Sequence, residues 1–173
     1  MPRVNATLAA WNAATAEAAR EAMLACCGSA RWAKAMTDLR PVASVPALSE
    51  AADRVWSAMQ EPDWIEAFAC HPRIGERKSA VHTGAQSATW SQQEQVQTGS
   101  ASERVMAEMA AGNKQYEERF GFTYIVCATG KSAEEMLAIL RRRLASTREV
   151  ELLEAAEQQR QIMQIRLGKW LVE

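Results

Sequence analysis

His71 is the side chain whose type and position are best suited to acid–base chemistry. It follows a run in which Trp64, Ile65 and Phe68 recur at helical spacing, and it directly precedes Pro72. Proline disfavours helical geometry in the residue before it and has no amide proton, so a helix is expected to end here. An imidazole titrates near neutral pH and could donate or accept a proton at such a junction. Alternatively, the histidine only caps the helix or faces solvent.

A second candidate group lies at residues 91–95, which read Ser-Gln-Gln-Glu-Gln. The S-x-x-E spacing is that of a capping box, in which Ser91 and Glu94 would bond to backbone amides at the start of a helix. In the alternative, Glu94 and Gln95 face inward and offer a carboxylate and an amide to a ligand with several N–H and C=O groups. Both interpretations stay open at this point.

One alternative is a metal site built from His71, Glu76, His82 and Glu94. None of these residues has the i, i+4 histidine spacing of helical zinc sites, so no metal site is expected. The sequence also lacks a glycine-rich phosphate loop, a G-x-S-x-G elbow and a C-x-x-C pair. Their absence argues against the commonest nucleotide-binding, acyl-transfer and redox functions.

Length and composition predict one globular domain over residues 1–173, with a core of ordinary size. A net charge of −1 gives no field that would hold a nucleic-acid backbone, and the basic run Arg141–Arg143 is expected to be a solvated helix face. No stretch reads as a signal peptide or a membrane span. The four cysteines lie among apolar neighbours and are expected to be buried, reduced thiols, which suits a cytoplasmic protein.

Apolar residues recur at helical spacing along most of the chain, which predicts an all-α fold. Helices are expected over residues 5–27, 30–37, 48–59, 63–70 and 101–120, from about 91, from a capping box at 132–135, and from Thr147 to the end. Residues 71–88 show no periodicity and predict a long loop. The expected fold is a single-domain helical bundle with a long active-site loop and one short extended segment. Core contacts expected in the last helix are Val150, Leu153, Met163, Leu167 and Trp170.

The short extended segment comprises residues 123–127, the only run dense in β-branched and aromatic residues. No second run could pair with it, so we expect a buried extended chain rather than a sheet strand. Its backbone amides and carbonyls would then need hydrogen-bond partners. The segment is therefore a candidate wall for a polar ligand.

Four short motifs follow one another along the chain. They are Trp64-x-x-Ala67-Phe68-x-x-His71-Pro72-Arg73-Ile74-Gly75, Ser91-x-x-Glu94-Gln95, Asn113-x-x-Tyr116-x-x-x-Phe120-Gly121-Phe122 and Ile162-x-x-x-Arg166-Leu167. In this order and at these separations they resemble the OHCU decarboxylase family, where OHCU is 2-oxo-4-hydroxy-4-carboxy-5-ureidoimidazoline. The resemblance extends from Leu8 to Leu167.

The resemblance implies an all-helical homodimer that converts OHCU, a product of urate oxidation and ring hydrolysis, to (S)-allantoin and carbon dioxide. The substrate has a ring C=N bond that can accept the electron pair, so no cofactor is expected. The expected catalytic residues are His71, as acid or base, and Glu94, which would hold the substrate's N–H groups. Expected substrate contacts are Pro72, Ser91, Gln95, the segment Tyr124, Ile125, Val126, Cys127 and Ala128, and Arg166.

The chain departs from the family pattern in two places, and each departure leads to a further expectation. Thr123-Tyr124 stands where the family often has Pro-Phe, which should preserve the backbone contacts. The transthyretin-like domain that is fused in some relatives has no counterpart here, so another protein is expected to carry out the preceding hydrolysis. Two alternatives stay open, a catalytically inactive helical ureide-binding or regulatory protein and a metal-dependent hydrolase of a related ureide.

Overall fold

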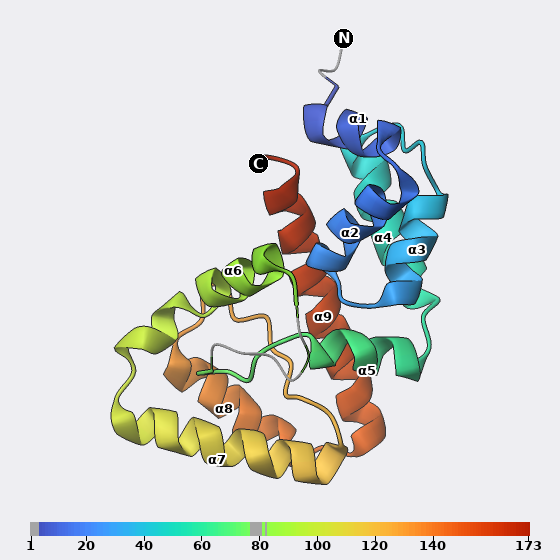
Figure 1. Ribbon diagram of the computed structural model, residues 1–173. Coiled ribbons are helices and arrows are strands. Elements are labelled where there is room, and N and C mark those ends of the chain that lie inside the picture. Colours follow the sequence, from blue (N-terminus) through green and yellow to red (C-terminus); the bar gives the residue numbers. More distant parts are fainter. Residues whose placement is uncertain (1–3, 77–80, 82) are drawn as a thin grey trace. The chain divides into compact units, whose positions relative to one another are not determined.

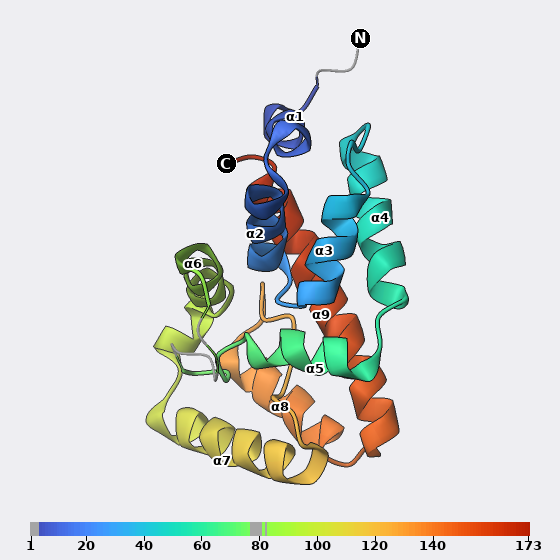
Figure 2. The same ribbon diagram turned by 45° about the vertical axis from the view of Figure 1, so that its right-hand side comes forward.

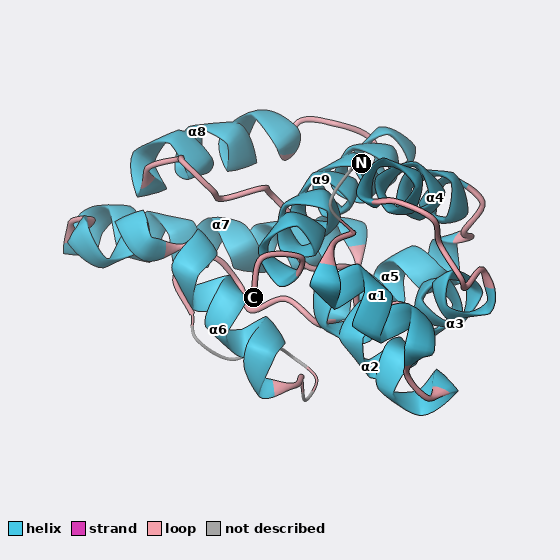
Figure 3. Ribbon diagram, turned by 90° about the horizontal axis from the view of Figure 1, so that it is seen from above, coloured by secondary structure: helices cyan, strands magenta, loops and turns pink. Residues whose placement is uncertain are grey.

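The computed structural model describes residues 4–76, 81 and 83–173. Over these residues it contains nine α-helices and one short 3-10 helix and no strand (Figures 1 and 3), which confirms the all-α prediction. No helix in this part of the chain is both long enough and apolar enough to cross a bilayer. The helices are α1 (Ala6–Ala13), α2 (Ala16–Cys26), α3 (Ala30–Asp38), α4 (Val45–Ser57), α5 (Glu61–Ala69), α6 (Ala85–Glu94), η1 (Val96–Ser100), α7 (Glu103–Phe120), α8 (Ala133–Arg143) and α9 (Arg148–Trp170).

The chain forms two compact units, and the helices α5 and α9 each contribute residues to both. Unit 1 contains the chain up to Glu66 together with Arg160–Glu173, and unit 2 is Ala67–Gln159. The prediction of one domain over residues 1–173 stays a prediction.

In unit 1, helices α2, α3 and α4 pack in succession (Figure 2). The prediction of one continuous helix over residues 5–27 is wrong, because two helices occupy this stretch. Ala14 is extended, and the Thr15 side chain accepts from the amide of Ala18 to start α2. The carbonyls of Trp11 and Ala14 accept hydrogen bonds from Arg40 Nη1 at 2.7 and 2.8 Å. The guanidinium of a residue distant in sequence thus satisfies carbonyls at the end of α1 that have no partner within the helix.

Serine side chains start several helices by accepting a hydrogen bond from the third residue after them. Ser44 starts α4 at Val45, three residues earlier than expected, with Pro46 in its first turn where the missing amide proton is harmless. Ser132 and Glu135 form the predicted capping box of α8, which is confirmed. Gly121 ends α7 as expected, in the left-handed conformation with φ at 82°.

In unit 2, α7 and α8 lie side by side (Figures 1 and 2), with Gly112 against Leu140 where their backbones approach. An aromatic cluster surrounds the fully buried Tyr116. The ring centroids of Phe120, Tyr124 and Phe122 lie 4.7, 5.4 and 5.7 Å from its own. The polar end of Tyr116 is bound as well, because its hydroxyl donates to Glu151.

The expectation that the basic run Arg141–Arg143 is a solvated helix face is wrong for Arg143. Its side chain is only 3% exposed and forms an ion pair with the equally buried Glu151, while Arg141 is mostly exposed. Arg143 also donates to the carbonyl of Ile125 and lies over the ring of Tyr124 at 5.0 Å. The reason is helical spacing, since residue 143 shares the inward face of α8 with the buried Leu140.

Two of the expected core contacts in the last helix are also wrong. Val150 is 57% exposed and Leu153 is 62% exposed, whereas Leu152, Ala155 and Ala156 are buried. In the first turns of α9 the inward face therefore lies one position away from the face that we expected. Met163 and Leu167 are buried as predicted, and Trp170 is half-buried.

The buried ion pair yields a test of stability. Replacing Arg143 with Met leaves the carboxylate of Glu151 buried without its partner, so the free energy of unfolding should fall by about 3–5 kcal/mol in urea titrations. The double variant Arg143→Met/Glu151→Leu should recover most of the loss. Arg141→Met is the matched control, because its side chain is exposed, and it should stay close to wild type. Equal effects of the two single variants would contradict this account.

Candidate active site

His71 lies just beyond the end of α5 at Ala69, as expected from the proline that follows it. Its backbone amide still donates to the carbonyl of Phe68 at 3.1 Å, which closes a last turn. The side chain is 9% exposed, and its Nε2 lies 2.7 Å from Oε1 of Gln159 on α9. A buried imidazole at hydrogen-bond distance from a fixed partner has the placement that acid–base chemistry needs.

The chain after Pro72 forms a tight turn, in which the amide of Glu76 donates to the carbonyl of Arg73 at 2.9 Å. Two side chains hold the turn, since Asn113 donates to the carbonyl of Ile74 at 3.1 Å and Gln95 accepts from the amide of Gly75 at 2.9 Å. The side chain of Arg73, the first residue of the turn, forms a two-pronged ion pair with Glu117, with N–O distances of 2.7 and 3.0 Å.

The capping-box interpretation of Ser91 and Glu94 is wrong. Helix α6 begins at Ala85, after Gly84, so Ser91 lies within the helix and Glu94 is its last residue. Both side chains are buried, on the same face as Trp90. The S-x-x-E spacing therefore places two polar groups on one inward helix face rather than at a helix start. The loop after His71 is also shorter than predicted, because α6 takes in residues 85–88.

Residues 123–128 belong to neither a helix nor a strand, and Tyr124 to Ala128 are buried, as expected of the predicted wall. Side chains supply partners to its backbone. The amide of Cys127 donates to Gln158 at 2.8 Å, and its carbonyl accepts from Lys131 at 2.7 Å. The Tyr124 hydroxyl donates to the carbonyl of Met136 at 3.0 Å.

Arg166 belongs to unit 1, where its side chain is buried. Its Nη1 donates to the carbonyl of Ala25 at 3.3 Å. Burial raises the pKa of the neighbouring Cys26 thiol to about 12, although the positive charge of Arg166 acts in the opposite direction. Cys26 is therefore an inert core thiol, as predicted.

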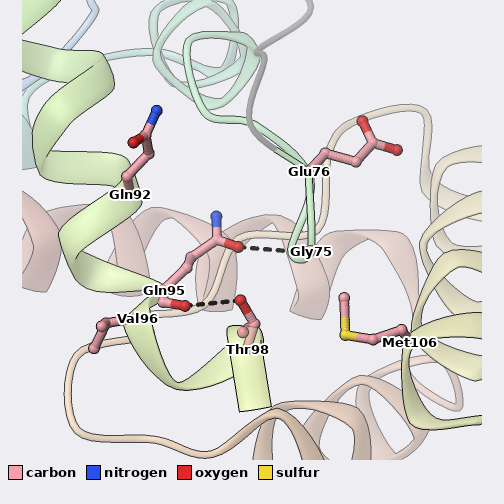
Figure 4. A pocket seen from close by; sticks show the side chains of 8 residues that line it. Gly75, Glu76, Gln92, Gln95, Val96, Thr98 and Met106 are labelled. Carbon is pink, nitrogen blue, oxygen red and sulfur yellow. Dashed lines mark hydrogen bonds between the residues drawn. The ribbon is translucent and has the colours of Figure 1, made fainter. Parts of the chain in front are cut away.

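A pocket of about 400 Å³ opens in unit 2 beside the turn (Figure 4). Figure 4 shows the side chain of Gln95 extending to Gly75, while the Gln95 carbonyl accepts from Thr98 Oγ1 at 2.7 Å. Gln95 is the predicted site residue that lines this pocket. The lining residues are Gly75, Glu76, Gln92, Gln95, Val96, Thr98, Gly99 and Met106.

Gln158 and Gln159 contact the predicted site residues Cys127 and His71, and the sequence reasoning missed both. Position 159 lies between the buried Ala155 and Met163, four residues from each, so helical spacing could have shown that its amide faces inward. The partner of the amide could not have been inferred, because His71 is 88 residues away in the sequence.

No group of three or more His, Cys, Asp or Glu side chains that could hold a metal ion occurs among the described residues. His82, one member of the metal-site alternative, lies outside them.

A sequence model of the OHCU decarboxylase family matches residues 12–168. The chain belongs to the OHCU decarboxylase family. Among curated relatives of this family member, the uric acid degradation bifunctional protein of Arabidopsis thaliana is 36% identical over 146 residues, which cover 83% of this chain and 44% of that protein. The 2-oxo-4-hydroxy-4-carboxy-5-ureidoimidazoline decarboxylase of Amia calva is 37% identical over 100 residues, 57% of this chain and 55% of that protein. The chain thus spans about half the length of these relatives.

The fold of this OHCU decarboxylase family member also matches a solved structure. A crystal structure of an OHCU decarboxylase in the presence of (S)-allantoin is similar with a TM-score of 0.74 and 32% sequence identity. The match covers 88% of this chain and 99% of that one.

The turn after His71 gives a prediction about Gly75, whose φ of 92° favours glycine. An added Cβ would also lie 2.6 Å from Cε of Met106. Gly75→Ala should therefore lower the free energy of unfolding by roughly 1–2 kcal/mol, measured in urea. Gly168→Ala is the matched control, because Gly168 is helical with open space around it, and it should stabilise the protein slightly. If Gly75→Ala is as stable as wild type, the turn does not require glycine.

Proposed function

We propose that this chain decarboxylates OHCU to (S)-allantoin and carbon dioxide in urate degradation, without a cofactor. The observation that carries the proposal is the structural match, over nearly the full length of both chains, to an OHCU decarboxylase solved in the presence of (S)-allantoin. The buried His71 and Glu94 support it, because both supply groups of the kind that the reaction needs.

The substrate carries its own electron sink. The carbon that bears the carboxylate and the hydroxyl lies next to the ring carbon of a C=N bond. When carbon dioxide leaves, the electron pair of the broken C–C bond forms a C=C bond, and the C=N electrons move to nitrogen, which takes a proton. The hydroxyl proton passes to a base, so that the C–OH group becomes the product carbonyl, and the carbon that bears the ureido group gains a proton. The protein has only to orient the substrate and move protons.

His71 is the proposed acid–base residue in this scheme. It takes the proton of the substrate hydroxyl, which favours loss of the carboxylate. Its burial supports this role, because exclusion of water strengthens each contact at the reacting carbon. Protonation of the product carbon from one face then sets the S configuration.

The remaining roles follow from the chemistry of each group. Glu94 accepts hydrogen bonds from the ureido or ring N–H groups, and Ser91 and Gln95 add hydrogen-bonding groups from the same part of the chain. Pro72 and the backbone of residues 124–128 form the walls. Arg166 pairs with the substrate carboxylate. That contact must weaken in the transition state, since stronger binding of the ground state would slow the reaction.

The proposal also covers the location, the oligomeric state and the binding partners of the protein. We place it in the cytoplasm as a homodimer that binds a small molecule and neither nucleic acid nor membrane. The near-zero net charge supports the absence of nucleic-acid binding. All four cysteines are free thiols, which supports a cytoplasmic location, although only three are buried and the expectation of burial is wrong for the half-buried Cys70. Sedimentation of the purified protein tests the dimer.

His71→Asn tests the catalytic role. The variant keeps a polar side chain of similar size but loses the titratable nitrogen, so turnover should fall by about 10²–10⁴-fold, measured as carbon dioxide release from freshly made OHCU. His82→Asn is the control, because the sequence has only two histidines, and it should keep its activity. Near-normal turnover in folded His71→Asn would remove His71 from the mechanism. Loss in both variants, together with inactivation by a chelator, would favour the metal-dependent alternative.

Glu94→Gln tests the carboxylate. The amide keeps the shape but loses the charge, so kcat/KM should fall by about ten- to a hundred-fold, as expected when hydrogen bonds to a charged group are lost. Gln93→Glu, a change at an exposed position of the same helix, is the control. Full activity of Glu94→Gln would show that the carboxylate is not needed. A protein that binds the substrate but accelerates nothing would be the inactive ureide-binding protein.

A further inference from the structure

Gln159 has a fully buried amide, and its neighbours on the inward face of α9 are apolar. The residues one turn before and after it, Ala155, Ala156, Ile162 and Met163, are all buried. Only one end of the amide is bonded within the described part of the chain, because Oε1 lies 2.7 Å from His71 Nε2 while Nε2 of Gln159 has no partner there. A leucine would fill this position without leaving a buried N–H group unsatisfied, which costs about 1–3 kcal/mol. The amide therefore has a use other than packing.

The contact determines which nitrogen of His71 carries the proton. A neutral imidazole has one N–H donor and one acceptor nitrogen, and an amide oxygen can only accept. With Oε1 of Gln159 facing Nε2, the proton lies on Nε2 and the lone pair on Nδ1. If the amide were turned so that its nitrogen faced the ring, the proton would lie on Nδ1 instead.

We propose that Gln159 is a positioning residue that holds His71 as the Nε2–H tautomer, so that Nδ1 is the atom that takes the substrate's hydroxyl proton. The second half of this statement rests on the proposed function, and the first half does not. A hydrogen bond from a neighbouring side chain to one ring nitrogen fixes both the tautomer and the ring orientation of a catalytic histidine. The same turn of α9 also binds a backbone group, because Oε1 of the neighbouring Gln158 accepts from the amide of Cys127.

The test begins with nitrogen NMR of the wild-type protein, in which the tautomer of an imidazole is read from its two ring nitrogens. Only two histidines are present, and the spectrum of His71→Asn identifies the signals of His71. We expect the proton on Nε2 near neutral pH. A proton on Nδ1 in wild type overturns the proposal, and this result needs neither substrate nor a Gln159 variant that folds.

Two variants then separate positioning from packing. Gln159→Leu removes the acceptor, so His71 should become a mixture of tautomers and kcat should fall by about ten- to a thousand-fold with a smaller change in KM, less than the loss expected for His71→Asn. Gln159→Glu keeps an acceptor and should retain the Nε2–H tautomer. Its negative charge favours the imidazolium, so the acid limb of the pH–rate profile should move to higher pH.

Gln164→Leu is the matched control on the same helix. Its amide has hydrogen bonds to Ser49 and Asp53 in unit 1 at 2.8–3.0 Å, so its loss should lower stability without altering the His71 signals or the pH profile. If Gln159→Leu behaves like Gln164→Leu in the spectra and the profile, the amide is only structural and the proposal fails. If wild type does not accelerate decarboxylation at all, the proposed function and the role of Nδ1 fail together, while the tautomer is still decided by the spectra.

Discussion

Buried backbone without regular secondary structure must find hydrogen-bond partners outside a helix or sheet, and in unit 2 many of these partners are side chains. Residues 123–128 lie inside the unit but form neither a helix nor a strand. Arg143 donates to the carbonyl of Ile125, while Gln158 and Lys131 bind the two backbone groups of Cys127. Polar contacts, as well as apolar packing, therefore tie this segment to α8 and α9.

The same requirement applies to the turn after His71. Asn113 from α7 and Gln95 at the end of α6 bind backbone groups of Ile74 and Gly75, and Gln159 from α9 binds the imidazole. Two side chains, from α7 and from the residue that caps α6, thus hold the turn, and one from α9 holds the imidazole beside it. Groups held in this way need little rearrangement when a substrate binds, which is the structural condition that the proposed decarboxylation requires.

Local patterns predicted the helical class and many of the helix ends, because proline, glycine and capping serines act through neighbouring residues. The end of α5 before His71, the capping box at Ser132 and the stop at Gly121 are examples. The break at Ala14 was missed although Thr15 caps α2 locally, and the hydrogen bond from Arg40, 26 residues away, to the Ala14 carbonyl gave no local signal. Arg143 was misjudged because three adjacent arginines were treated as one surface, although helical spacing turns the third one inward.

The candidate site was predictable only in part for the same reason. The motifs identified His71, Ser91 and Glu94, and the structure shows all three buried. The interpretation of Ser91 and Glu94 as a helix start depended on local spacing, and it failed because α6 begins six residues before Ser91. Gln159 contacts His71 across 88 residues, and a single sequence contains no local signal for such a pair.

The central claim is that this chain forms (S)-allantoin from OHCU. The most direct measurement is circular dichroism of the allantoin produced from urate, in a reaction coupled to the enzymes that oxidise urate and hydrolyse its product. The account predicts that adding this protein accelerates the appearance of allantoin and gives it the dichroic signal of the S enantiomer. Allantoin that appears at the spontaneous rate and without a dichroic signal, in the presence of the folded protein, would contradict it.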